Sequence, residues 1–291
     1  MASKCRQIKE GRKMEIINEI TKEIFEKNVP AAKMPERNTS VYERIMTQFE
    51  VSYGNLVCNV ISEGCKGHVD SDSEMKRLAL RAVCIDAFVR SCRSLDLVLT
   101  STGFGIVSSE STAPASRGRV DALVEEMILE ELDTVDSIVG EMMKVEGWGN
   151  TPQAARCIPT LFYSPQYLRL HTTLPVTSQN WQFAKGRAVT AEALLRNEIS
   201  GEYMDELLLK LRTASLSNAD ITIVRTCRRF MGDFISQPEN PKPNKLIRQE
   251  IVEQLEKYPD YYTTYNHSEL FRKRHGKRYE NKREDPTFFF M

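Results

Sequence analysis

The sequence predicts a mainly α-helical protein: a multi-helix bundle with a short β-hairpin and an irregular, β-containing middle segment. Three observations support this fold class. Through most of the 291-residue chain, apolar residues recur three or four positions apart, as on the buried face of an amphipathic helix. Two β-branched runs between Leu95 and Ser109 flank a Ser-Thr-Gly turn, which is typical of a hairpin. Glycines and prolines break the helical pattern between Glu146 and Val176.

Residues 1–146 are expected to form an N-terminal helical domain. Its helices are predicted at about 9–27, 40–63, 72–92 and 115–142. Serine, threonine or proline stands at the start of the last three, as is common at helix N-termini. The hairpin is predicted near 97–107. Because two strands alone are only marginally stable, it should pack on helices or pair with a neighbouring subunit.

From Asp121 onward, the predicted helix at 115–142 has an acidic polar face, with no Lys or Arg until Lys144. One interpretation is a solvated face opposite the buried stripe, which is what charge runs usually are. The other is a surface that repels DNA or receives a basic segment, such as Arg272–Arg283 of another copy. The acidic residues of this face are Asp121, Glu125, Glu126, Glu130, Glu131, Asp133, Asp136 and Glu141.

A domain boundary is predicted after residue 146. The middle segment that follows is expected to contain strands at Pro159–Tyr163 and Tyr167–Thr172. A second helical domain, 147–236, should then hold helices at about 178–195, 201–213 and 218–235. The Pro-rich run at 237–244 is typical of a semi-rigid linker. It opens a predicted linker and C-terminal arm, 237–291, with one further helix at about 247–255.

Composition excludes several classes of protein. Forty basic and forty acidic residues give a net charge of zero, so the chain as a whole is not attracted to nucleic acid. No apolar run approaches the roughly 20 residues that span a bilayer, and the first 20 residues lack the apolar stretch of a secretory signal. We therefore expect no membrane contact. Seven cysteines without a CxxC pair favour reduced thiols.

No motif supports catalysis or a bound metal. The four histidines include no pair at ligand spacing, and Cys65 with His68 would supply only half of a zinc site. The stretch Thr102–Gly105 lacks the third glycine and the Lys-Ser/Thr of a phosphate loop, and a hairpin turn explains it more simply. We therefore predict no enzyme, no metal and no cofactor. An enzyme with an unfamiliar site would need a cleft lined by titratable groups.

The C-terminal residues predict a contact with a partner. The sequence closes on Phe288, Phe289, Phe290 and Met291, and exposed aromatics at a chain end invite aggregation unless they are buried. Burying them in a neighbour would latch two copies together, and the alternative is that the arm folds back and buries them on its own domain. Phe104 and Ile106 of the predicted hairpin are the second set of expected partner-binding residues.

A basic stretch precedes this end and offers an alternative function. Between Phe271 and Arg283 there are seven Lys or Arg and one Glu, interleaved with aromatic residues. Such a segment is typical of nucleic-acid contact, and a solvated tail is the competing interpretation. The expected DNA-contacting residues are Arg272, Lys273, Arg274, Lys277 and Arg278.

The central stretch LDLVLTSTGFGIVSSESTAPASRGRVDAL, Leu95–Leu123, resembles an uncharacterised structural protein family of phages and prophages of gut bacteria, encoded near capsid genes. Ile199–Leu208 and the aromatic C-terminus are similar as well, so the resemblance covers about 40–291. It implies a virion structural protein, a head–tail connector or neck component that assembles with copies of itself and with portal, capsid or tail proteins. It also implies a location in the virion, and in the host bacterial cytoplasm during assembly. It brings no catalytic residues.

Overall fold

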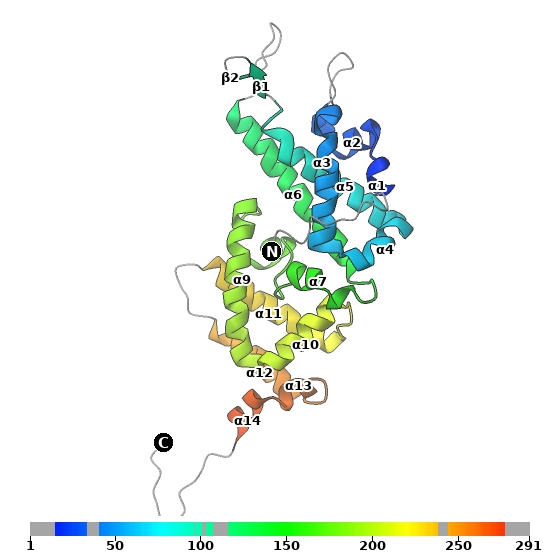
Figure 1. The fold of residues 1–291 in the computed structure, drawn as a ribbon. Helices are drawn as coiled ribbons and strands as arrows, with labels where there is room; N and C mark the ends of the chain where they lie inside the picture. Colours follow the sequence, from blue (N-terminus) through cyan, green and yellow to red (C-terminus); the bar gives the residue numbers. More distant parts are fainter. Residues whose placement is uncertain are drawn as a thin grey trace, which may run out of the picture.

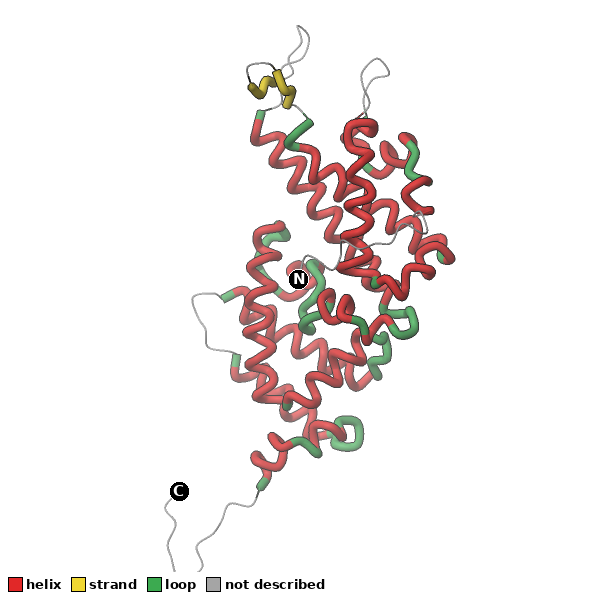
Figure 2. The backbone as a smooth tube through the Cα atoms, viewed as in Figure 1, coloured by secondary structure: helices red, strands yellow, loops and turns green. Residues whose placement is uncertain are grey.

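Helices dominate the computed structural model, which describes residues 15–33, 41–95, 97–100, 103–106, 116–237 and 244–276 (Figures 1 and 2). In the N-terminal part, α5 packs between α3 and α6. The bounds of these three long helices are α3 (Val41–Leu56), α5 (Ser73–Cys92) and α6 (Arg117–Met142). Ile45, Phe49 and Tyr53, four residues apart on α3, are buried, as expected for one helical stripe. Asp72 caps α5, since its carboxylate accepts a 2.8 Å hydrogen bond from the Met75 amide.

Several short helices lie around α3 and α5, and α1, α2 and α4 pack against one or both of them. They are α1 (Glu15–Asn18), α2 (Lys22–Asn28), η1 (Pro30–Ala32), η3 (Glu63–Cys65) and α4 (Lys66–Ser71). The single helix predicted at 9–27 is interrupted within its described part, because Thr21 starts α2 by accepting a hydrogen bond from the Ile24 amide. Buried Ile16, Ile20 and Phe25 still extend the core.

A π-helical turn, η2 (Val57–Ile61), ends α3 and joins it to the next segment of the chain. Its last bond runs from the Ser62 amide to the Val57 carbonyl, 2.9 Å. Two of its carbonyls accept hydrogen bonds from side chains that follow α6: the Trp148 indole donates to Val60 (2.8 Å), and the Gln153 amide donates to Cys58 (3.1 Å). Carbonyls that a helix end leaves without an intrahelical partner thus accept hydrogen bonds from side chains of a later segment. These donors belong to η4 (Trp148–Asn150) and α7 (Pro152–Cys157).

The middle segment contains neither of the two predicted strands, so this part of the predicted fold class is wrong. Instead of a strand at Tyr167–Thr172, the chain forms α8 (Gln166–His171), with Leu168 buried and Leu170 exposed. Pro159–Tyr163 has no regular secondary structure. A short strand here would have no ladder partner among the described residues, whereas a helical turn satisfies its own backbone groups. Of the two leucines in this segment, Leu168 alone is buried, so their spacing of two does not mark a strand.

The C-terminal part is a second group of packed helices. Its elements are α9 (Ser178–Ile199), α10 (Gly201–Arg212), α11 (Asn218–Ser236), α12 (Lys245–Lys257), α13 (Thr263–Asn266) and α14 (Glu269–His275). α11 packs against α8, α9 and α12. A Cβ at Gly232 would collide with the His171 carbonyl, so glycine permits the close approach of α8 to α11. The described part of the predicted arm is therefore folded onto this group, with Ile251, Leu255 and Tyr265 buried.

The strands described by the structure form one isolated antiparallel pair. They are β1 (Leu97–Thr100) and β2 (Gly103–Ile106), with Leu97 opposite Ile106 and Leu99 opposite Phe104. Figure 1 shows the pair beyond the ends of α5 and α6, away from the C-terminal helices. In the described chain it joins no larger sheet, so the predicted fold class is corrected to helical throughout the core, with no β-containing middle.

Candidate functional site

The predicted hairpin residues lie on β2, at one end of the molecule. The backbones of Phe104 and Ile106 pair with β1 in a two-stranded ladder. Among the described residues no third strand extends this ladder on either side. Each strand therefore keeps an edge that another strand could join, which is the geometry that strand addition between chains requires.

The four apolar residues of the predicted C-terminal latch, Phe288–Met291, lie outside the described residues, as do Lys277 and Arg278. The structure places the segment that leads to them. Ser268 caps α14 by accepting a 3.1 Å hydrogen bond from the Phe271 amide. Figure 1 shows α14 at the end of the molecule opposite the hairpin.

The basic residues of α14 do not form one uncompensated patch. Lys273 pairs with Glu269 at 2.7 Å, and Arg274 contacts both the Glu198 carboxylate (3.3 Å) and the Tyr265 hydroxyl (2.7 Å). Arg272 is the one of the three with no side-chain ion pair among the described residues, and it lines a shallow hollow beside Phe271. Carboxylates within the chain therefore offset two of the three cations that sequence reasoning assigned to DNA.

Carboxylates on the acidic face of α6 pair with side chains and a backbone amide of other segments of the same chain. Neither interpretation of the sequence predicted these contacts within the chain. Arg93, the residue that follows α5, pairs with Asp121 at 3.1 Å. On the other side, the Glu125 carboxylate accepts hydrogen bonds from the Ser178 amide (2.7 Å) and hydroxyl (2.6 Å) at the first turn of α9. An anion at this position is favoured by the helix dipole. Further pairs within the chain are Arg81–Glu130, Gln166–Asp133, Ser164–Asp136 and Lys144–Glu141.

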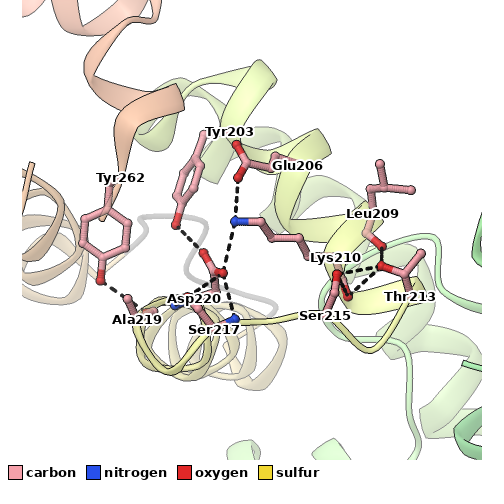
Figure 3. A network of polar contacts seen from close by, with 10 residues as sticks. All are labelled: Tyr203, Glu206, Leu209, Lys210, Thr213, Ser215, Ser217, Ala219, Asp220 and Tyr262. Carbon is pink, nitrogen blue, oxygen red and sulfur yellow. Dashed lines mark hydrogen bonds and ion pairs between the residues drawn. The ribbon is translucent and has the colours of Figure 1, made fainter. Parts of the chain in front are cut away.

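A buried polar network joins α10, α11 and the turn between them (Figure 3). Asp220 is 1% exposed and accepts hydrogen bonds from the Ser217 hydroxyl (2.7 Å), the Lys210 ammonium (3.2 Å) and the Tyr203 hydroxyl (3.3 Å). Burial alone would raise the pKa of Asp220, but the hydrogen bonds from Ser217 and Lys210 hold it below its ordinary value. Lys210 also pairs with Glu206 at 2.6 Å.

This network resembles a catalytic cluster in composition, but its groups are engaged with one another. Ser217 and Asp220 form a reciprocal capping box at the start of α11, so the carboxylate is committed to starting that helix. Nearby, the Tyr262 hydroxyl donates to the Ala219 carbonyl at 3.2 Å and ties the segment before α13 to the same helix end. The arrangement stabilises the fold.

Within the part of the chain that the structure describes, no three His, Cys, Asp or Glu side chains cluster closely enough to hold a metal ion. Cys65 and His68 lie on consecutive short helices, η3 and α4. No helix among the described residues is long and apolar enough to cross a membrane. Burial raises the pKa of the Cys84 and Cys227 thiols to about 12, so both behave as small apolar core residues.

The part of the chain that the structure describes is a helical fold with a projecting strand pair. Residues 37–157 are similar to a family whose description is "Family of unknown function (DUF6712)". This segment is less than half of the chain, and it runs from α3 through the hairpin to the last residue of α7. No curated protein and no solved structure matches the chain.

The matched segment includes both sides of the contact between η2 and the residues that follow α6. It contains both the η2 turn and the Trp148, Gln153 and Cys157 side chains that donate to it. The predicted boundary at 146 falls between these two halves of one hydrogen-bonded junction. Sequence reasoning missed the junction because backbone carbonyls leave no pattern in the sequence.

Proposed function

We propose that the chain is a structural protein of a phage or prophage particle, a head–tail connector or neck component that assembles with copies of itself. Its further partners would be portal, capsid or tail proteins, in the virion and in the host bacterial cytoplasm during assembly. The resemblance of Leu95–Leu123 supports this role, and that stretch contains the strand pair.

The observation that carries the proposal is the open two-stranded ladder. Two strands without a third partner are marginally stable in water. β1 and β2 nevertheless project beyond α5 and α6, and their outer edges have no partner strand among the described residues. Pairing with a strand of a neighbouring copy would satisfy these edges, because β-augmentation supplies main-chain hydrogen bonds between chains.

The second contact element is the apolar end, Phe288–Met291, which remains a prediction from the sequence. Each of its four large side chains would contribute about 1.5–3 kcal/mol when fully buried in a partner. Together with the strand pair, this apolar end would give one copy two different contact elements. A head-to-tail contact of this kind closes into a ring when the rotation between copies is suitable.

Size-exclusion chromatography with light scattering tests the proposal. The hairpin variant Phe104→Ser/Ile106→Ser and deletion of 287–291 should each reduce the oligomer to smaller species, with the far-UV circular dichroism unchanged. The matched control is Leu170→Ser/Leu246→Ser, which replaces two apolar side chains that are 70% and 77% exposed on α8 and α12. Normal assembly of both test variants would refute the proposal. A gene for a portal, capsid or tail protein beside that of the chain would support it independently.

DNA contact by the basic segment is the alternative, and one observation favours it: Arg272 has no carboxylate partner among the described residues and precedes Lys277 and Arg278 in sequence. Affinity for duplex DNA should then fall steeply with salt, because counterions are released on binding. The variant Arg272→Ala/Lys277→Ala/Arg278→Ala should weaken binding and flatten the salt dependence. No measurable affinity at low salt would remove this alternative.

A further inference from the structure

A half-enclosed cavity of about 160 Å³ lies between α3, η2, α5 and α6, outside the surfaces discussed above. It is close in size to engineered cavities of about 150 Å³ that hold benzene. One part of its wall is apolar, and the other carries hydroxyl, amide and charged groups. The apolar part is formed by Leu56, Val60, Ala82 and Val135, and the polar part by Ser52, Asn55, Asn59, Asp86, Arg90 and Glu131.

Negative charge exceeds positive charge in this wall. Arg90 pairs with Asp86 at 2.7 Å, one turn away on α5, and its side chain is 45% exposed, which places it where the cavity meets solvent. Glu131, on α6, has no hydrogen-bond donor among the described residues. With Asp86 and Glu131 both ionised, one guanidinium faces two carboxylates, so the site carries one uncompensated negative charge.

The buried hydroxyl of Ser52 is the independent sign of a missing ligand. Ser52 is 2% exposed and lines the cavity, yet its Oγ has no hydrogen-bond partner. Buried polar atoms in folded proteins are nearly always paired, with protein, water or a bound group. The π-helical turn η2 also contributes to the wall through Asn59 and Val60, and π-turns recur at functional sites.

We propose that this cavity binds a primary alkylammonium group, with the charged end between Asp86, Glu131 and the Ser52 hydroxyl and the alkyl chain along Leu56, Val60 and Val135. The ligand chemistry follows from the wall: a cation with hydrogen-bond donors meets carboxylates and a hydroxyl, and a short hydrocarbon stem meets aliphatic side chains. A free alkylamine and the lysine side chain of a second copy share this chemistry. The inference does not rest on the proposed assembly role.

Binding at this site should strengthen as the pH rises through neutrality. Burial and the nearby Asp86 charge raise the pKa of Glu131 to about 7, so the carboxylate gains its charge in this range. The charged groups facing it are Asp86 and Arg90 on α5, whereas α3 and η2 contribute only the uncharged Ser52, Asn55 and Asn59. An alkylammonium ion keeps its proton throughout, because its pKa lies near 10.

Isothermal titration calorimetry with n-butylammonium chloride tests the site on the full chain. The cation should bind at pH 8 and about tenfold more weakly at pH 6, where the ionised fraction of a group with a pKa near 7 is about tenfold smaller. The neutral n-butanol and the anion n-butyrate are matched ligands and should not bind detectably. Absence of butylammonium binding at pH 8, or tighter binding of butyrate, would overturn the proposal.

Variants separate binding from folding. Glu131→Gln should weaken binding about tenfold or more and remove its pH dependence, since a charged hydrogen bond is lost. Ser52→Ala should weaken binding without lowering the melting temperature of the unliganded chain, because its hydroxyl has no partner to lose. The control Glu126→Gln changes an exposed carboxylate on the same helix and should bind as the parent does. Unaltered affinity and pH dependence in Glu131→Gln would refute the assignment.

The source of the ammonium group is decided by adding n-butylammonium to the assembled protein. Dissociation that requires Glu131 would assign the site to a lysine of a neighbouring copy. An oligomer that binds the cation and stays intact would assign it to a free amine. Either result supports the cation site.

Discussion

Replacement of Trp148 tests whether the N-terminal and C-terminal helices share one core. Its side chain is 0% exposed, and its indole donates a 2.8 Å hydrogen bond to the Val60 carbonyl in the η2 turn. Trp148→Ala should lower the free energy of unfolding by about 3–5 kcal/mol, the usual cost of removing a large buried aromatic side chain. Trp148→Phe keeps most of the apolar volume but leaves the carbonyl without its donor, which should cost about 1–3 kcal/mol.

Urea unfolding followed by two probes measures these effects. Far-UV circular dichroism reports the helix content of the whole chain. Tryptophan fluorescence reports the surroundings of Trp181 on α9, because replacing Trp148 removes the other of the two tryptophans in the sequence. With a continuous core, both midpoints should fall together in Trp148→Ala. The control Leu170→Ala removes a side chain that is 70% exposed and should change stability by less than about 0.5 kcal/mol. A loss below about 1 kcal/mol in Trp148→Ala, or a Trp181 transition that does not move, would refute the shared core.

Three further predictions concern carboxylates. The neutral form of Glu131 is favoured in the folded chain, so its contribution to stability is full below the unfolded pKa of 4.5 and is lost as the pH rises towards 7. Glu131→Gln should therefore stabilise the chain by about 1–3 kcal/mol at pH 8 and change its stability little at pH 4. Urea titrations at both pH values measure this difference. Glu125→Ala should cost about 1–3 kcal/mol in thermal unfolding because the Ser178 amide loses its acceptor, whereas the exposed neighbour Glu126→Ala should cost less than about 0.5 kcal/mol; equal effects would contradict the cap between α6 and α9. Asp220→Asn should destabilise the chain by about 2–4 kcal/mol at pH 7, measured by urea unfolding, and an unchanged midpoint would show that the network in Figure 3 is not structural.

The long helices could be predicted from the sequence because their signals are local. The apolar repeat of α6 predicted a helix at about 115–142, and the structure gives Arg117–Met142. α10 and α11 were likewise predicted to within about one residue at each end. In each case the apolar periodicity marks the helix, so no distant contact is needed to define the element.

The features that sequence reasoning missed depend on contacts between distant residues. The strand predicted at Tyr167–Thr172 required a partner strand, and without one the segment formed α8. The η2 turn depends on side chains of η4 and α7 that follow about ninety residues later. α13 and α14 were not predicted, because helices of 4 and 7 residues are too short to show an apolar repeat.

The same limit applies to the candidate sites. The acidic face of α6 was evident in the sequence, but its partners on α5, α8 and α9 were not, since a charge pattern does not show which surface it meets. The cavity is assembled from Ser52, Asp86 and Glu131 on three different helices, and no sequence pattern links these three residues. The resemblance directed attention to the hairpin and could not indicate this cavity.

Negative-stain electron microscopy of the purified full chain, over a series of protein concentrations, tests the proposed assembly most directly. We predict closed rings of uniform diameter whose fraction rises with concentration and falls in Phe104→Ser/Ile106→Ser. Particles of single-chain size at every concentration would contradict the proposal that the chain is a self-assembling structural protein.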